Sequence, residues 1–253
     1  MGRPTQKGFL RLEGGSMGET TFSKKNGRYL AGEKIVTASK HLWKYDPRFA
    51  RRREIANQFT TGVKAAKLIH DAVRAIVPRK DMTIGNRLRK LMISVVYMDS
   101  VSKPGEFKIQ PDNLSAVTGF NFNKSISLRS VFNTRYTTSI NRETGELLIH
   151  IPSFIPADTI KVPKGATHFK ISAAGFAFDF ENKIIEGKWV TSENMLWNEA
   201  DTGEIIIPFN ISANSVHPVM LFLGVEFVQE FAGVTNSVGH HKLDPLCIVE
   251  VSI

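Results

Sequence analysis

Short apolar segments separated by glycine and proline fill the chain from residue 106 to its end, and they restrict the fold more than any other feature. The stretch "PVMLFLGVEFVQEF" (residues 218–231) is apolar at nearly every position of its first half, which is typical of a central strand covered on both faces. About seven such segments at short spacing are typical of packed antiparallel sheets. The sequence therefore predicts an antiparallel, immunoglobulin-like β-sandwich over residues 106–253.

Two turn sequences predict β-hairpins. Asn26-Gly27, between "TTFS" and "RYLA", is a dipeptide that favours a two-residue hairpin turn. The loop "NRETG", between "SVFNTRYTTSI" and "ELLIHI", ends in glycine and predicts a second hairpin. Two strands alone are marginally stable in water, so we expect the first hairpin to pack on another part of the chain or on a neighbouring copy. Phe22 and Tyr29 are its predicted anchors.

A helical region is predicted between these β-rich parts. Asp46 is a good N-cap and Pro47 suits the first helical position. Apolar residues then recur at helical spacing, with Gly62 as a candidate break or bend, up to Pro78, which ends the helix. A second helix is expected from about residue 81 to residue 98, and a helical hairpin is the simplest arrangement.

The predicted fold class is therefore α+β. We divide the chain into an N-terminal arm with a hairpin (residues 1–45), a basic helical region (residues 46–105) and the sandwich (residues 106–253).

Charge is unevenly distributed along the chain. Residues 1–110 contain 23 Lys+Arg and 9 Asp+Glu, a net charge of +14, whereas residues 111–253 contain 10 Lys+Arg and 15 Asp+Glu, a net charge of −5. Solubility alone does not require such a division, which makes the molecule an electric dipole. A basic front and an acidic back favour head-to-tail association of copies.

Cationic side chains gather at the start of the first predicted helix, where they oppose the helix dipole. This placement is compatible with a solvated surface, with an acidic protein partner or with nucleic acid, and no recognised nucleic-acid motif decides among them. The residues predicted to bind another copy or a polyanion are Arg51, Arg52, Arg53, Lys64, Lys67, Arg87, Arg89 and Lys90. The predicted acidic partner face consists of Glu181, Glu186, Glu226 and Glu230.

No catalytic constellation stands out. The only cysteine, Cys247, lies in an apolar segment and is interpreted as a core residue. The adjacent pair His240-His241 has no further ligands at metal-site spacing. The segment "GGSMGET" lacks the Lys-Ser/Thr ending of a P-loop. We therefore expect no enzyme activity, no metal, no cofactor and no small-molecule substrate.

The compartment follows from what the sequence lacks. The N-terminal residues contain no apolar run of signal-peptide length, and no segment approaches the ~20 apolar residues of a membrane helix. We therefore expect a protein without membrane contact, located in the cytoplasm or within a particle assembled there.

Several stretches resemble a family of uncharacterised proteins of Bacteroidota. They are "TTFSKKNGRYLAGEK", "DPRFARRRE" with "GVKAAKLI", "SFIPADTI", "GATHFKI" and "LFLGVEFVQE". The resemblance extends along most of the chain. It implies a bacterial or phage-related intracellular setting, and it transfers neither an activity nor functional residues.

The leading functional hypothesis is a non-enzymatic structural protein. It would self-assemble as a homo-oligomer into a filament, tube or shell, through contacts between the basic N-terminal part of one copy and the acidic C-terminal part of another. The alternative is a nucleic-acid-binding or packaging protein that uses the basic N-terminal half.

Overall fold

A computed structural model gives the fold of the chain in two compact units, residues 1–53 and residues 54–253. The division falls within a long helix. The structure describes residues 4–5, 11–12, 15–34, 39–77, 81–199, 201–238 and 243–253.

The first unit contains short strands and short helices. In chain order they are β1 (Pro4–Thr5), β2 (Arg11–Leu12), β3 (Gly15–Met17), β4 (Thr20–Lys25), β5 (Arg28–Glu33), α1 (Lys40–Tyr45) and η1 (Pro47–Phe49). The predicted hairpin is confirmed: β4 pairs with β5 around Asn26 and Gly27, which have φ values of 51° and 78°. Positive φ at both central residues fits the turn that matches the twist of the flanking strands.

The second unit is organised around a large antiparallel sheet. Its two central strands are β8 (His168–Asp179) and β12 (Val219–Phe231), which pair along ten positions. The outer strands are β9 (Ile184–Thr191) and β10 (Met195–Leu196), both beside β8, and β13 (Val234–Ser237) and β14 (Leu246–Ser252), both beside β12. The prediction that residues 218–231 form a central strand is confirmed.

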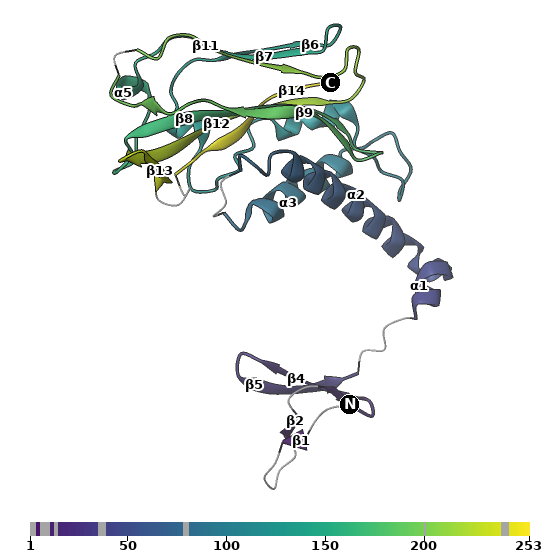
Figure 1. The fold of residues 1–253 in the computed structure, drawn as a ribbon. Coiled ribbons are helices and arrows are strands. Elements are labelled where there is room, and N and C mark those ends of the chain that lie inside the picture. The colour runs from purple at the N-terminus through teal and green to yellow at the C-terminus, as the bar shows by residue number, and fades with distance from the viewer. Residues whose placement is uncertain are drawn as a thin grey trace. The chain divides into compact units, whose positions relative to one another are not determined.

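A smaller sheet packs on one face of the large sheet (Figure 1). Its strands are β6 (Thr137–Asn141), β7 (Glu146–Ile151) and β11 (Ile205–Asn210), with β7 in the middle. The hairpin predicted around "NRETG" joins β6 to β7 and is confirmed.

Helices lie along the opposite face of the large sheet (Figure 1). They are α2 (Ala50–Ala72), α3 (Ile84–Tyr97) and the short η2 (Pro111–Val117). Two further short helices lie elsewhere: α4 (Leu128–Val131) packs into the layer of the small sheet, and α5 (Pro156–Thr159) lies beside the small sheet (Figure 1). Gly62 was the expected break or bend of the first helix, but α2 is continuous through this position. Pro78 lies outside the described residues.

Alternation along the central strands divides the core into two layers. On β8, Phe169 and Ile171 face the small sheet, whereas Phe176 and Phe178 face the helices. Successive side chains of a strand point to opposite faces, so a strand with both faces covered must be apolar at nearly every position. The predicted α+β class, with its N-terminal hairpin and C-terminal antiparallel sheet, is confirmed. Two packed sheets are consistent with a β-sandwich, but an immunoglobulin-like arrangement is not confirmed.

The helices cross at Gly62. A Cβ atom at this position would lie 2.7 Å from the Cα atom of Ile93 in α3, closer than any ordinary contact. Glycine is therefore required because the two helix backbones touch. In a helix interior, alanine is generally more stable than glycine by about 1 kcal/mol. Helix propensity therefore favours alanine at position 62, whereas the close crossing requires glycine.

We predict that Gly62→Ala destabilises the protein by about 1–3 kcal/mol, because the added methyl group forces the helices apart. Thermal denaturation followed by circular dichroism measures the effect. Gly85→Ala is the matched control, since the nearest atom to its added Cβ is 3.8 Å away, and it should leave the melting temperature unchanged or raise it. An equal gain in stability for both variants would contradict the close crossing.

Candidate assembly surfaces

The predicted N-cap Asp46 organises the junction between α1 and α2. Its carboxylate accepts a hydrogen bond of 2.9 Å from the backbone N–H of Arg48, and it pairs with the Arg48 guanidinium, with an Nη2–Oδ2 distance of 2.7 Å. These hydrogen bonds from Arg48 lower the pKa of Asp46. Asp46 and Pro47 thus begin the 3-10 turn η1, which leads directly into α2.

The three consecutive arginines occupy different environments. Arg53 Nη1 donates hydrogen bonds of 2.8 Å to Trp43 O and 2.9 Å to Asp46 O. A cation at these carbonyls, at the C-terminal end of α1, is favourable, so Arg53 stabilises the local fold. Arg51 and Arg52 are exposed, and they remain candidates for a binding surface.

Arg52 lines a shallow cavity in the first unit. Its guanidinium carbon is 5.5 Å from the centre of the Phe49 ring, a cation–π distance. Leu42 and Arg48 complete the lining, and the volume is about 310 Å³. The lining of the cavity therefore combines two apolar and two basic side chains.

No described residue of the first unit is buried. Its exposed large apolar side chains include Met17, Tyr29, Leu30, Leu42, Trp43 and Tyr45. The predicted anchors Phe22 and Tyr29 lie on one face of the β4–β5 hairpin, because Phe22 is opposite Ala31 and Lys24 is opposite Tyr29. Lys24 Nζ is 5.1 Å from the centre of the Tyr29 ring. Phe22 is only partly covered, so neither anchor packs into a core of the described residues.

The boundary between the units, after residue 53, separates the positive charge from the rest of the chain more sharply than a division after residue 110. Residues 1–53 contain 13 Lys+Arg and 4 Asp+Glu, so their net charge is +9. Residues 54–253 contain 20 of each kind and are neutral. The whole net charge of the protein therefore resides in the first unit.

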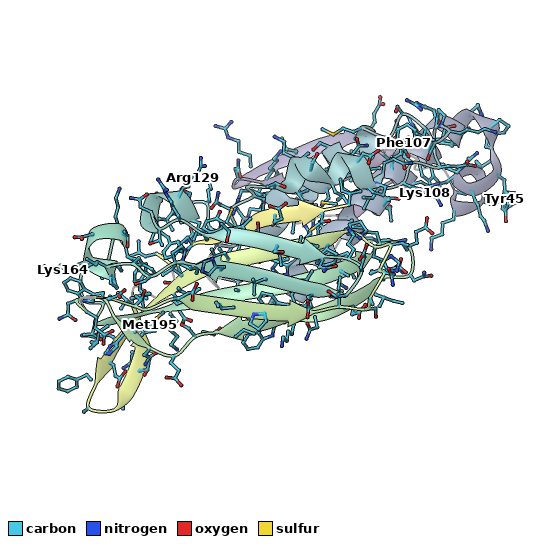
Figure 2. All side chains as sticks on the ribbon, turned by 90° about the horizontal axis from the view of Figure 1, so that it is seen from above. Tyr45, Phe107, Lys108, Arg129, Lys164 and Met195 are labelled. Carbon is cyan, nitrogen blue, oxygen red and sulfur yellow. The ribbon has the colours of Figure 1, made fainter. Side chains whose placement is uncertain are left out.

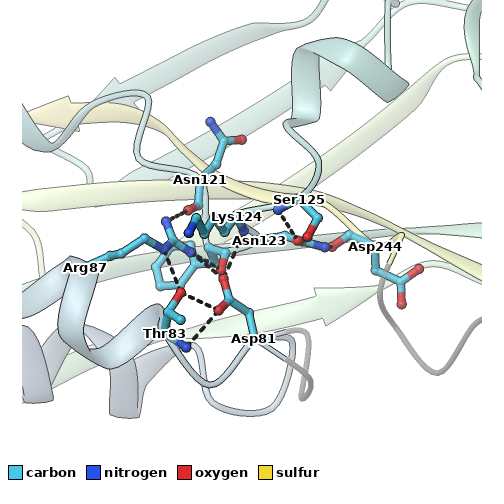
Figure 3. A network of polar contacts seen from close by, with 9 residues as sticks. Asp81, Thr83, Arg87, Asn121, Asn123, Lys124, Ser125 and Asp244 are labelled. Carbon is cyan, nitrogen blue, oxygen red and sulfur yellow. Dashed lines mark hydrogen bonds and ion pairs between the residues drawn. The ribbon is translucent and has the colours of Figure 1, made fainter.

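Four other predicted basic residues are exposed on the helices of the second unit. They are Lys64 and Lys67 on α2, and Arg89 and Lys90 on α3. Arg87 differs from them, because its guanidinium is engaged within the protein (Figure 3).

Arg87 joins α3 to the segment that follows η2. Its guanidinium donates bonds of 2.7 Å to each of the carbonyls of Asn121 and Phe122, and pairs with Asp81 Oδ2 at 2.8 Å. The Asp81 side chain is only 12% exposed. Desolvation alone would raise the pKa of Asp81, but hydrogen bonds from Thr83, the Lys124 backbone and Arg87 lower it to about 2. Arg87 therefore stabilises the fold, and its predicted role in binding stays a prediction.

All four predicted acidic residues take part in interactions within the chain, and two of them do so outside β12. Glu181 Oε1 is 2.6 Å from Lys108 Nζ. Glu186 Oε1 accepts bonds of 2.6 Å from the backbone N–H and the hydroxyl of Ser212.

The other two acidic residues share one face of β12. Glu230 Oε2 accepts a bond of 2.9 Å from Asn194 Nδ2, and Glu226 stands opposite Lys170 on β8. Glu226 also lines a cavity of about 360 Å³ with the buried Ser172. Glu226 and Glu230 thus lie on the same face of β12, about 13 Å apart along the strand, and Glu181 and Glu186 lie outside β12.

The β12–β13 hairpin presents an apolar tip that the sequence analysis missed. Phe231 is 80% exposed and its cross-strand partner Val234 is 59% exposed. Between them, Ala232 and Gly233 have φ values of 52° and 79°. The segment "FAGV" could have indicated a two-residue turn, but the preceding apolar run hides where the strand leaves the core.

Comparison with known proteins adds no identity. No protein-family model matches the chain, and no curated protein matches it significantly. The resemblance to the Bacteroidota family thus stays a prediction.

The described residues contain neither a membrane-spanning helix nor a cluster of metal ligands. Among the helices in the described part of the chain, none has the length and apolar character needed to cross a membrane. Within the same described ranges, no group of three or more His, Cys, Asp or Glu side chains could hold a metal ion. The pair His240-His241 lies outside those ranges. Burial raises the pKa of the Cys247 thiol to about 11, as expected for a core cysteine.

We predict that Asp81→Asn destabilises the protein by about 2 kcal/mol at pH 7. The lowered pKa means that the carboxylate contributes its stability above the ordinary value of 3.8, and that this contribution is lost as the pH falls towards about 2. The difference between wild type and variant should therefore shrink from pH 4 to pH 2. Urea denaturation across this range measures it, with Asp71→Asn, an exposed change on α2, as control. A difference that is independent of pH would contradict this role of Asp81.

Proposed function

We propose that the protein is a non-enzymatic structural protein that self-assembles in the cytoplasm into a filament, tube or shell. Residues 1–53 of one copy dock onto the second unit of the next. The observation that supports this most is a unit with regular secondary structure, a net charge of +9 and no buried residue in its described part.

The first unit needs a partner to cover its apolar side chains. A three-stranded sheet without a hydrophobic face packed on something is marginal. Within the described strands, β3 and β5 each pair only with β4, so each offers an open edge to a strand from another chain. A neighbouring copy can supply both the missing strand and the missing apolar contact.

Electrostatic attraction favours a contact between the basic first unit of one copy and carboxylates on the second unit of another. The second unit is neutral overall, so the attraction must be local, and we assign it to the face of β12 that bears Glu226 and Glu230. Arg51 and Arg52 are the exposed members of the arginine triplet. A contact between two different surfaces of identical copies can repeat from each copy to the next. It forms a ring if the rotation between copies closes after a full turn, and an open filament if it does not.

The second candidate function is binding of single-stranded nucleic acid by the first unit. The excess charge favours phosphates, and exposed Trp43 and Tyr45, 38% and 59% exposed, offer surfaces on which bases stack. The same cationic surface would then serve a polyanion in place of, or in addition to, another copy.

We predict that the double variant Arg51→Glu, Arg52→Glu loses the assembled species and becomes monomeric. Arg53 is left unchanged because it stabilises the junction with α1. The matched control is Lys161→Glu, Lys164→Glu, which changes the net charge equally at two exposed positions of the second unit that belong to no predicted binding surface. Light scattering after size-exclusion chromatography, together with electron microscopy, measures the result. Normal assembly of the arginine variant, or a monomeric wild type at every concentration, would refute the proposal.

Nucleic-acid binding is tested separately with a fluorescent single-stranded oligonucleotide. If the first unit binds phosphates, affinity should fall with salt, with a slope near 0.7 per contacted phosphate. The arginine double variant should bind more weakly than the lysine control. Absence of binding at ~50 mM salt removes the second candidate and leaves the assembly proposal unaffected.

A further inference from the structure

The β12–β13 hairpin projects from the second unit. We call its tip, Phe231 and Val234, the knob. Figure 2 shows the hairpin extending beyond the neighbouring strands, close to the labelled Met195. Phe231 and Val234 form its last cross-strand pair, so their side chains stand on the same face. Phe231 is 80% exposed, more than any other large aromatic side chain among the described residues.

The base of this hairpin is firmly held. The backbone N–H of Glu230 donates a bond of 2.8 Å to Thr167 Oγ1, and its carboxylate is fixed by Asn194 at 2.9 Å. Two residues before Glu230, Val228 is 1% exposed. A ring presented on a rigid support loses little conformational freedom when it is bound, which favours its use as a contact.

The first unit contains a cavity of complementary character. Its lining consists of the apolar Leu42 and Phe49 and the basic Arg48 and Arg52. An aromatic ring entering it would contact the Phe49 ring and the Arg52 guanidinium, which already lies over that ring. The cavity is thus suited to an aromatic side chain flanked by negative charge.

The hairpin provides that combination of ring and charge. Residues 219–238 include Glu226 and Glu230 and no Lys or Arg, whereas the unit that holds the cavity has a net charge of +9. Charge complementarity therefore favours another copy of this chain as the occupant.

We propose that Phe231 of one copy inserts into the cavity formed by Leu42, Phe49 and Arg52 of the next copy. The inference rests on the proposed self-assembly and names its central contact. Glu230 precedes Phe231 on β12 and points to the opposite face of the hairpin, so it contributes to the contact through the net negative charge of the hairpin. Since knob and cavity are different surfaces, the contact is heterologous and can repeat along an assembly.

The first test is Phe231→Ser in the full-length protein. We expect the assembly midpoint in light scattering to move to at least tenfold higher protein concentration. Val216→Ser is the matched control, because Val216 is 86% exposed on another loop, and it should leave the midpoint unchanged. Unchanged assembly of Phe231→Ser, while the Arg51, Arg52 double variant is monomeric, would overturn the knob contact and leave the proposed function intact.

The second test identifies the two sides of the contact. One preparation has Leu42→Cys and another has Phe231→Cys, while the native Cys247 is buried. After mixing and mild oxidation, a disulfide between the two variants is expected in excess over either variant's own dimer. Leu42→Cys mixed with Val216→Cys is the control and should give no such excess. A predominant Phe231→Cys homodimer would show a knob-to-knob contact and overturn the inference, as would cross-linking equal to that of the control.

Discussion

The burial of both faces of one antiparallel sheet is the constraint on which the second unit depends. β8 and β12 are the central strands, and each must offer an apolar side chain to the small sheet and to the helices in alternation. Close approach on both sides requires small residues at defined points. At Gly175 on β8, an added Cβ would lie 3.0 Å from Leu147 and Phe209 of the small sheet. On the helical side, Gly62 allows α2 to touch α3. These packing demands leave little freedom for function within the sheet itself.

The candidate binding surfaces lie where this packing ends, in the first unit and at the β12–β13 hairpin. The first unit has no buried residue in its described part, and it contains the entire excess of positive charge. The β12–β13 hairpin is the place where a central strand leaves the core and its apolar side chains become exposed. Both features are costly for an isolated molecule in water. A repeated contact between copies removes both costs at once, which is the physical reason for proposing assembly.

The arginines divide into those that bind backbone carbonyls and those that are exposed to solvent. Arg53 and Arg87 bind backbone carbonyls, and Arg87 also fixes the carboxylate of Asp81. Arg51 and Arg52 are exposed at the same helix start. Residue type and spacing cannot separate these classes, because the difference lies in which carbonyl oxygens the distant parts of the chain bring within reach of each guanidinium.

The sequence by itself determined the hairpins, the central strand and the helical segments, because turn chemistry and side-chain periodicity are local properties. Asn26-Gly27 and the apolar run at 218–231 were sufficient for two of these. Only the tertiary structure decided that two helices cross at Gly62, that the Arg87 guanidinium binds backbone carbonyls and that Phe231 projects into solvent. Those outcomes depend on neighbours remote in the chain. A glycine, an arginine or a phenylalanine has the same local preferences whether a distant backbone, a carbonyl or water lies beside it.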